Sequence, residues 1–172
     1  MIPYKRHTLS NGLTVAVNRD RQSKLAAVNI LYKVGARNED PARTGFAHLF
    51  EHLMFRGTRD VPDFDLPVQM ACGDNNAFTN NDYTDFYITL PKDNIETALW
   101  LEADRMTGLD ISPEALETEK RVVIEEYKQR YLNQPYGDQG MLLRSLVYTL
   151  HPYRWATIGL TPCLLYTSDA AD

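Results

Sequence analysis

The chain has 172 residues, of which 44% are hydrophobic and 24% charged, the size and composition of one globular domain with a buried core. Its 18 basic and 23 acidic residues give a net charge of −5, which argues against nucleic acid or an anionic membrane as the main partner. No apolar run approaches the roughly 18 residues of a membrane-spanning helix, and the N-terminus lacks the apolar segment of a signal peptide. Two cysteines, Cys72 and Cys163, cannot form a disulfide framework. We therefore expect a cytoplasmic protein of one domain.

The first 34 residues have the patterns of β structure. Lys5–Leu9 and Leu13–Val17 flank Asn11-Gly12, which predicts a hairpin with a two-residue turn. Leu25–Val34 is rich in Val, Ile and Tyr, and we expect it to be a central strand.

The rest of the chain is predominantly helical in pattern. A helix is predicted from Gly45 to about Arg56, with Thr44 as its N-cap and Gly57 just after its last turn. The later segments are predicted as a short helix before Gly73, strands over 76–79 and 84–90, and helices over 91–108, 113–132 and 140–150. Strands followed by helices on short connections predict an α+β fold, a mostly antiparallel sheet with helices packed on one face.

The first of these longer helices carries His48-Leu49-Phe50-Glu51-His52. Residues four apart lie on one helical face, so His48 and His52 can hold one metal ion between them. Glu51 borders the same face, and a carboxylate there can take a proton from a zinc-activated water. The order of residues is the reverse of the better-known zinc-protease motif. A buried histidine pair without metal is the competing interpretation.

A catalytic zinc site requires a third protein ligand, and the 113–132 helix offers carboxylates. At about 100° per residue, Glu119 and Glu126 fall inside the apolar stripe of this helix, two turns apart. The remaining glutamates, Glu114, Glu117 and Glu125, fall on the opposite face, which we expect to be solvated. Buried carboxylates need a positive partner, so Glu126 is the candidate third ligand and Glu119 an auxiliary carboxylate behind the metal. An ion pair to Arg or Lys is the alternative.

These segments and their spacing resemble the N-terminal domain of the insulinase/pitrilysin family, zinc metallopeptidases of the inverzincin type that include the mitochondrial processing peptidases. The likeness covers nearly all of residues 5–160. It rests on the histidine motif, on Glu119–Glu126, and on three further segments: Gly45-Phe46-Ala47, Asn75-Asn76-Ala77-Phe78-Thr79 and His151-Pro152-Tyr153.

The resemblance implies a zinc-dependent metalloendopeptidase that hydrolyses peptides or unfolded protein segments. It implies one Zn²⁺ on His48, His52 and Glu126, with Glu51 as general base and Glu119 as a supporting carboxylate. It also implies that Asn76 and Ala77 lie on an edge strand that pairs with the substrate backbone, a mode in which main-chain hydrogen bonds supply the affinity. Family members carry a second, homologous half, or a companion subunit, that this chain lacks.

Two other functions are compatible with parts of the pattern. A non-catalytic core or partner subunit on the same fold would need neither a base nor an open metal position, so the intact motif argues against it. S-ribosylhomocysteine lyases share a His-x-x-Glu-His helix but use a cysteine as third ligand. Cys72 has no metal-like neighbours in sequence, and we expect it to be a small core residue.

The last ten residues, CLLYTSDAAD, differ in character from the rest. The string can be back-translated into a nucleotide sequence that resembles a transposon-end adapter used in sequencing libraries. We therefore expect residues 1–162 to be a zinc-bearing N-terminal domain truncated at its C-terminus, and residues 163–172 to be non-native. A genuine short tail is the alternative.

Overall fold

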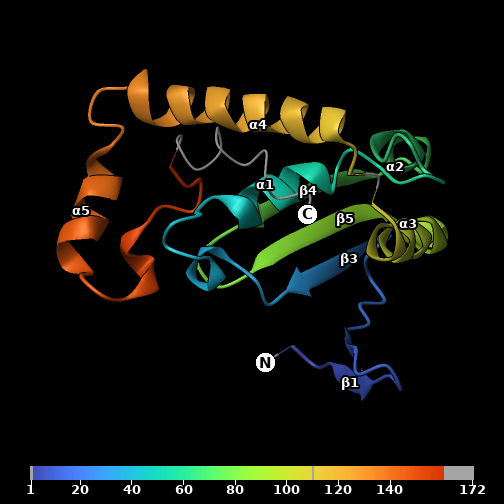
Figure 1. Ribbon diagram of the computed structural model, residues 1–172. Helices are drawn as coiled ribbons and strands as arrows, with labels where there is room; N and C mark the ends of the chain where they lie inside the picture. Colours follow the sequence, from blue (N-terminus) through green and yellow to red (C-terminus); the bar gives the residue numbers. More distant parts are fainter. Residues whose placement is uncertain (1, 110, 161–172) are drawn as a thin grey trace.

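The computed structural model describes residues 2–109 and 111–160 (Figure 1). Its main sheet is antiparallel, in the order β3-β5-β4, with β3 at Leu25–Tyr32, β4 at Asp74–Thr79 and β5 at Thr84–Pro91. The prediction that the strand beginning at Leu25 is central was wrong, because β5 holds the centre and β3 an edge. Burial explains the order: most of β5 is buried, whereas every second residue of β3 is exposed and only Val28 is fully buried.

A separate two-stranded hairpin precedes this sheet, formed by β1 (Lys5–Thr8) and β2 (Thr14–Val17), and it stands apart from the other elements (Figure 1). The hairpin was predicted, but its turn is longer than expected. Leu9 N–H donates to the carbonyl of Leu13 at 2.8 Å, and Gly12 N–H donates to Leu9 at 2.9 Å. Three loop residues therefore separate the paired positions, with Gly12 in the left-handed conformation (φ 88°) that this turn requires.

One face of the sheet is covered by α2 (Asp65–Met70) and α3 (Ile95–Thr107). Their core joins Val68, Ala98 and Leu101 of the helices to Val28, Ile88 and Leu90 of the strands. The inner side of α3 also buries an ion pair, in which Arg105 donates to Glu102 at 2.6 Å. The Arg105 guanidinium lies 3.9 Å from the ring centroid of Phe64 and 4.6 Å from that of Phe86, so aromatic faces replace part of its hydration.

A second layer carries the predicted metal motif. α1 (Phe46–Leu53) packs beneath α4 (Pro113–Tyr127), which crosses the top of the molecule in Figure 1. Leu49 and Leu53 of α1 meet Val123 of α4 in a core completed by Ala156 and Ile158. The other helical segments are a π-helical turn at Lys128–Leu132, α5 at Gln139–Val147, and 3₁₀ turns at Ala36–Asn38, Lys92–Asn94 and Pro152–Arg154.

The start of α1 differs from the prediction that Thr44 caps it. The N-cap is Gly45, whose φ of 97° is accessible mainly to glycine. A side chain at this position would also meet the carbonyl of Ile158 at 2.7 Å. The Glu39 carboxylate, from the preceding loop, accepts hydrogen bonds from the N–H groups of Gly45 (2.9 Å) and Ala47 (2.8 Å). A negative charge at a helix N-terminus also interacts favourably with the helix dipole.

The start of α4 follows the prediction, whereas Cys72 does not. Ser112 caps α4, its hydroxyl accepting from the N–H of Ala115 at 3.2 Å, and Pro113 occupies the first turn. Cys72 is exposed rather than a core residue. It lies in the left-handed region (φ 55°) just after α2, where its N–H donates to Gln69, so the chain reverses direction there and the side chain faces solvent.

No helix within residues 2–109 and 111–160 has the length and hydropathy needed to cross a bilayer.

Candidate metal centre

Three side chains from two helices converge between α1 and α4. The Nε2 atom of His48 lies 3.6 Å from Oε2 of Glu126, and the Nε2 atom of His52 lies 3.3 Å from the same oxygen. The two imidazole centroids are 4.7 Å apart. Within residues 2–109 and 111–160, these three side chains form a group that could share a metal ion: their potential ligand atoms all lie within 4.8 Å of one another. The structure thus brings together the three residues expected to bind metal.

The separation of these atoms suits a zinc ion. A tetrahedral zinc with bonds of about 2.0–2.1 Å holds its ligand atoms about 3.4 Å apart. The observed 3.3 and 3.6 Å match that spacing and are longer than the roughly 2.7–2.9 Å usual for a charge-assisted hydrogen bond, so the hydrogen bond between His52 and Glu126 is a long one. The Nδ1 atom of His48 is buried and lacks a hydrogen-bond partner among the described residues. The donor set, two imidazoles and one carboxylate, is one that catalytic zinc uses.

Glu119 lies behind His52, two turns before Glu126 on α4. Its Oε2 is 3.4 Å from Nδ1 of His52, the ring nitrogen that faces away from Glu126. The Oε1 atom is 3.6 Å from Arg56, so the residue also has the cationic neighbour that the alternative interpretation foresaw. Glu119 is buried, at 7% exposure. A carboxylate in this place orients an imidazole and raises its basicity.

The solvent-facing glutamates of α4 follow the helical-face prediction. The Glu125 side chain is 64% exposed and pairs with Lys128 at 2.6 Å. Glu117 is likewise exposed and pairs with Lys120 at 2.6 Å, and Glu114 is exposed in the first turn. Cys72 is not part of the metal-competent group, which removes the ligand that a lyase-like site would require.

Glu51 projects from α1 beside the ligand cluster. Its Oε2 accepts a hydrogen bond from the hydroxyl of Thr79, at the end of β4. Burial raises the pKa of Glu51, and this effect exceeds the opposing ones of the Thr79 hydrogen bond and the His52 charge. A raised pKa brings a carboxyl group nearer the range in which it exchanges protons at neutral pH.

The charge states of the three convergent residues differ. Burial lowers the pKa of His48 to about 4, so this imidazole is neutral at pH 7. Burial opposes the charged form of His52 as well, but the hydrogen bond and charge of Glu126 and the charge of Glu119 outweigh it, and the pKa is raised. The hydrogen bond from His52 lowers the pKa of Glu126. Glu126 is therefore negatively charged at neutral pH and can bind a cation.

The β4 strand is an edge of the described sheet and lies beside the cluster. Asn76 is exposed and Ala77 half-buried, and both line the same cavity as the histidines. The N–H of Ala77 donates to the side-chain Oδ1 of Asn76 at 2.8 Å. The Asn76 side chain thus accepts a hydrogen bond from the main-chain N–H of Ala77, which an added strand could otherwise use.

The cavity at this edge encloses about 560 Å³. Besides the predicted residues it is lined by Thr79 of β4, Arg130 and Tyr131 of the π-helical turn, and Met141 and Arg144 of α5. Arg130 pairs with Oε1 of Glu126 at 3.0 Å. The sequence analysis named Thr79 only as the last residue of the Asn75–Thr79 segment, without a role, and did not name Arg130 or Arg144, because the proximity of all three to the cluster depends on tertiary packing. The Thr79 contact could have been anticipated only from its place at the end of an edge strand.

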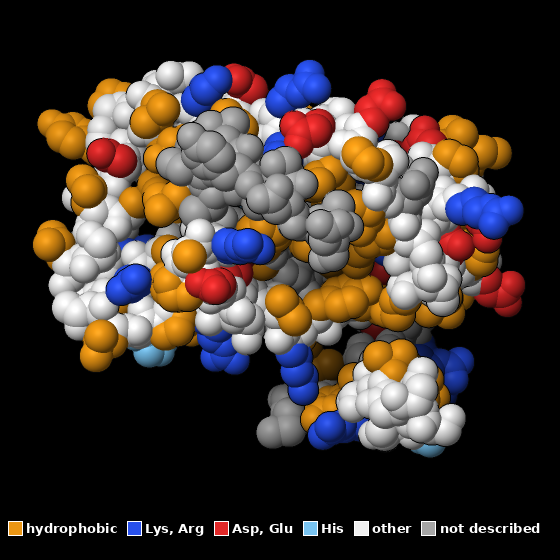
Figure 2. Space-filling model, viewed as in Figure 1, with side chains coloured by type: hydrophobic (Ala, Val, Ile, Leu, Met, Phe, Trp, Pro, Cys, Tyr) orange, Lys and Arg blue, Asp and Glu red, His pale blue; other side chains and the backbone are white. Residues whose placement is uncertain are grey.

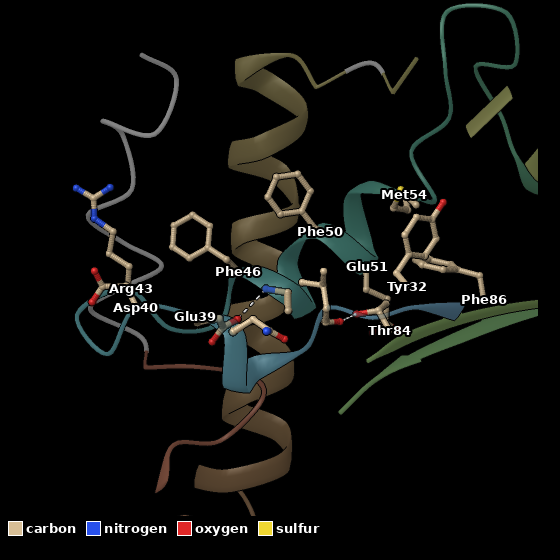
Figure 3. A pocket seen from close by; sticks show the side chains of 13 residues that line it. Tyr32, Glu39, Asp40, Arg43, Phe46, Phe50, Glu51, Met54, Thr84 and Phe86 are labelled. Carbon is tan, nitrogen blue, oxygen red and sulfur yellow. Dashed lines mark hydrogen bonds between the residues drawn. The ribbon is translucent and has the colours of Figure 1, made fainter. Parts of the chain in front are cut away.

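A second cavity, of about 550 Å³, lies on the other side of Glu51 (Figure 3). Phe46 and Phe50 reach it from α1, Met54 from the C-cap of that helix, and Tyr32, Thr84 and Phe86 from the sheet. Its wall is mostly apolar, in contrast to the polar metal cavity. Glu51 lines both cavities, so the candidate base lies at the boundary between an apolar and a polar space.

Comparison with known proteins identifies the family. The model of the insulinase family, peptidase family M16, matches residues 14–148, and the chain belongs to that family. The zinc protease PqqE of Helicobacter pylori is 36% identical over 155 residues, which cover 88% of this chain and 35% of PqqE. The probable mitochondrial-processing peptidase subunit beta of Schizosaccharomyces pombe is 33% identical over 124 residues, 71% of this chain and 27% of that protein.

A solved structure agrees with these matches. The crystal structure of a protease from Helicobacter pylori has a TM-score of 0.93 and 32% identity, and the match covers 99% of this chain and 41% of that chain. The expected α+β architecture and the expected membership of the insulinase family are therefore confirmed. The chain spans about a third of the length of the curated relatives it matches.

Proposed function

We propose that this chain is the metal-bearing part of a zinc-dependent metalloendopeptidase that hydrolyses peptides or unfolded protein segments. His48, His52 and Glu126 would hold one Zn²⁺. The observation that carries the proposal is the convergence of these three side chains at zinc-ligand spacing beside a further carboxylate, Glu51, that lines the same cavity and is not one of the three. Membership of a peptidase family supports it.

The ion supplies the electrophilic part of the chemistry: when bound, zinc lowers the pKa of a water molecule and polarises a carbonyl group. The protein supplies the proton transfers. Glu51 takes a proton from the attacking water and delivers it to the leaving amine. Thr79 fixes the orientation of the Glu51 carboxylate, and Glu119 orients the His52 imidazole.

The substrate would bind as an added strand on β4. Asn76 and Ala77 lie on the free edge, and their cavity is continuous with the histidine cluster. Displacement of the Asn76 side chain frees the N–H of Ala77 for a main-chain hydrogen bond to the peptide. Such pairing places little constraint on side chains, which suits unfolded segments of varied sequence.

A second half, on the same chain or on a companion subunit, would complete the enzyme. The relatives are roughly three to four times as long as the matched region, and one is named as a subunit. In this proposal residues 1–162 are the N-terminal domain, and residues 163–172, a non-native tail, lie outside the described residues. The predicted cytoplasmic location stays a prediction.

The full-length protein tests this function with denatured protein as substrate. Glu51→Gln preserves shape but removes the base, so kcat should fall by about 10²–10⁴-fold while the zinc content stays unchanged. Glu125→Gln, which alters an exposed carboxylate on α4, is the matched control and should keep full activity.

Four outcomes would contradict parts of the proposal. Turnover by Glu51→Gln at the wild-type rate, or turnover that survives metal chelation, would exclude the proposed chemistry. Loss of zinc from Glu51→Gln would mean that Glu51 is a ligand or a structural support. Full-length protein that binds zinc but cleaves nothing would favour the non-catalytic subunit.

A further inference from the structure

Arg144 of α5 is a cation on the wall of the metal cavity that lacks a carboxylate partner among the described residues. Its Nη1 donates to Oδ1 of Asn81 at 2.9 Å, a neutral amide that positions the guanidinium without neutralising it. The other arginine of the cavity, Arg130, is already paired with Glu126. Arg144 therefore has donors and a full charge available for a ligand.

The segment around Arg144 is fixed by a network that joins the C-terminal part of the fold to the β4–β5 turn. Asp82 of that turn pairs with Arg37 at 2.8 Å and accepts from the hydroxyl of Tyr153 at 2.7 Å. The indole of Trp155 donates to the carbonyl of Ala36 at 2.8 Å. Asn81, next to Asp82, is thereby held in place. A guanidinium that is positioned in advance loses little conformational entropy when it binds an anion.

Arg144 also has a defined place close to the candidate base. The hydroxyl of Thr79, the last residue of β4, bonds the candidate base, and Asn81, which holds Arg144, lies in the turn that follows. Arg144 and Glu51 line the same cavity of about 560 Å³. A peptide added to β4 would therefore bring a side chain a few residues from the cleaved bond near Arg144.

The charge balance of the cavity favours an acidic side chain there. The wall carries two arginines, Arg130 and Arg144, and two carboxylates, Glu51 and Glu126, so a bound divalent cation leaves it net positive. A carboxylate can accept two parallel hydrogen bonds from a guanidinium, which an amide or a cationic side chain cannot.

We propose that Arg144 is a specificity-determining residue that selects Asp or Glu in the substrate, a few residues from the cleaved bond and on one side of it. This inference rests on the proposed peptidase function. It adds a preference at one substrate position to strand pairing on β4, which otherwise depends little on the side chains of the peptide.

Cleavage-site profiling of a peptide library by the full-length protein, with mass spectrometry, tests the inference. We expect Asp and Glu to be enriched about 10-fold at one position. Arg144→Met should abolish this enrichment, and Arg144→Glu should replace it with Lys and Arg. Arg154→Met is the matched control, because this exposed arginine bonds the carbonyl of Thr149 and does not line the cavity. Its profile should equal that of the wild type.

A second measurement separates failure of the inference from failure of the proposed function. In a Glu51→Gln background, a fluorescent peptide with Glu at the selected position should bind about 10-fold more tightly than its Gln counterpart, and Arg144→Met should remove the difference. Cleavage with no acidic preference, or a preference that survives Arg144→Met, would overturn the role of Arg144 and leave the peptidase intact. Absence of any cleavage together with equal binding of the two peptides would reject both.

Discussion

His52 has a carboxylate facing each of its ring nitrogens. Glu126 lies on one side, in the group that would share a metal ion, and Glu119 lies on the other. Helical periodicity alone distinguished these two glutamates from Glu125, since residues seven apart on α4 face the same direction. A histidine held between two carboxylates is a costly arrangement for a core, and a cation in the cluster compensates for that cost.

Glu119→Gln tests the auxiliary carboxylate. The amide keeps the shape of the side chain but removes the charge behind His52, so zinc affinity should fall by about 10–100-fold. Competition with a chromogenic chelator measures the change. Glu117→Gln, an exposed position on the same helix, should leave affinity unaltered. An unchanged affinity in Glu119→Gln would assign this residue to the ion pair with Arg56 and to nothing else.

Elements with strong local signals were predicted well, and elements decided by tertiary packing were not. The hairpin and the Ser112-capped helix follow from turn and capping residues that lie within a few positions of one another. The order of the strands does not, because it depends on which strand the helices cover. On α3, the apolar Leu99 is largely exposed while Glu102 and Arg105 are each 2% exposed. Hydropathy cannot foresee a charged pair that is buried against aromatic rings.

The start of α1 depends on a residue that the sequence did not identify. Glu39 accepts hydrogen bonds from Gly45 and Ala47 and is six residues upstream of the N-cap, too far for a local capping motif. This contact positions the first turn of the helix that carries His48 and His52. The predicted cap, Thr44, was plausible by residue type, but the left-handed Gly45 redirects the chain.

Glu39→Ala should lower the free energy of unfolding by about 1 kcal/mol at neutral pH, measured by urea denaturation, because two N–H groups lose their acceptor. Burial raises the pKa of Glu39 above 4.5 against the opposing effect of the N–H donors. The folded protein therefore binds this proton more tightly than the unfolded chain, and the contribution of Glu39 declines as the pH rises through the raised pKa. The difference between wild type and variant should be larger at pH 4 than at pH 7.

Glu96→Ala, which removes an exposed carboxylate in the first turn of α3, provides the control and should change stability by less than about 0.5 kcal/mol. A Glu39→Ala protein as stable as this control would show that water accepts hydrogen bonds from the N–H groups of Gly45 and Ala47 as favourably as the Glu39 carboxylate does.

For the molecule as a whole, the residues expected to bind the metal all lie within this chain, whereas the surfaces expected to bind substrate are exposed. All three candidate ligands lie within residues 48–126, on helices that pack on one another. The free edge of β4 and the exterior of α5 are open, with the side chains of Leu142, Leu143, Leu146 and Val147 exposed (Figure 2). Open edges and apolar patches of this kind favour association with another surface.

The 172-residue chain expressed alone should therefore bind zinc but cleave peptides at least about 10-fold more slowly than the full-length protein. Catalysis also requires a substrate held in register and water excluded around the metal, and a single half with an open edge provides neither. Zinc titration and a peptidase assay on both proteins measure the two properties. Comparable, chelator-sensitive turnover would show that this domain is self-sufficient.

The most direct test of the central claim is the position of the metal. A crystal of this chain grown with zinc, measured on both sides of the zinc absorption edge, should show one anomalous peak. We predict that the peak lies about 2.0–2.2 Å from Nε2 of His48, Nε2 of His52 and a carboxylate oxygen of Glu126, and that it is absent in Glu126→Ala. A folded protein without zinc between α1 and α4, or with zinc bound there but not by Glu126, would contradict the account.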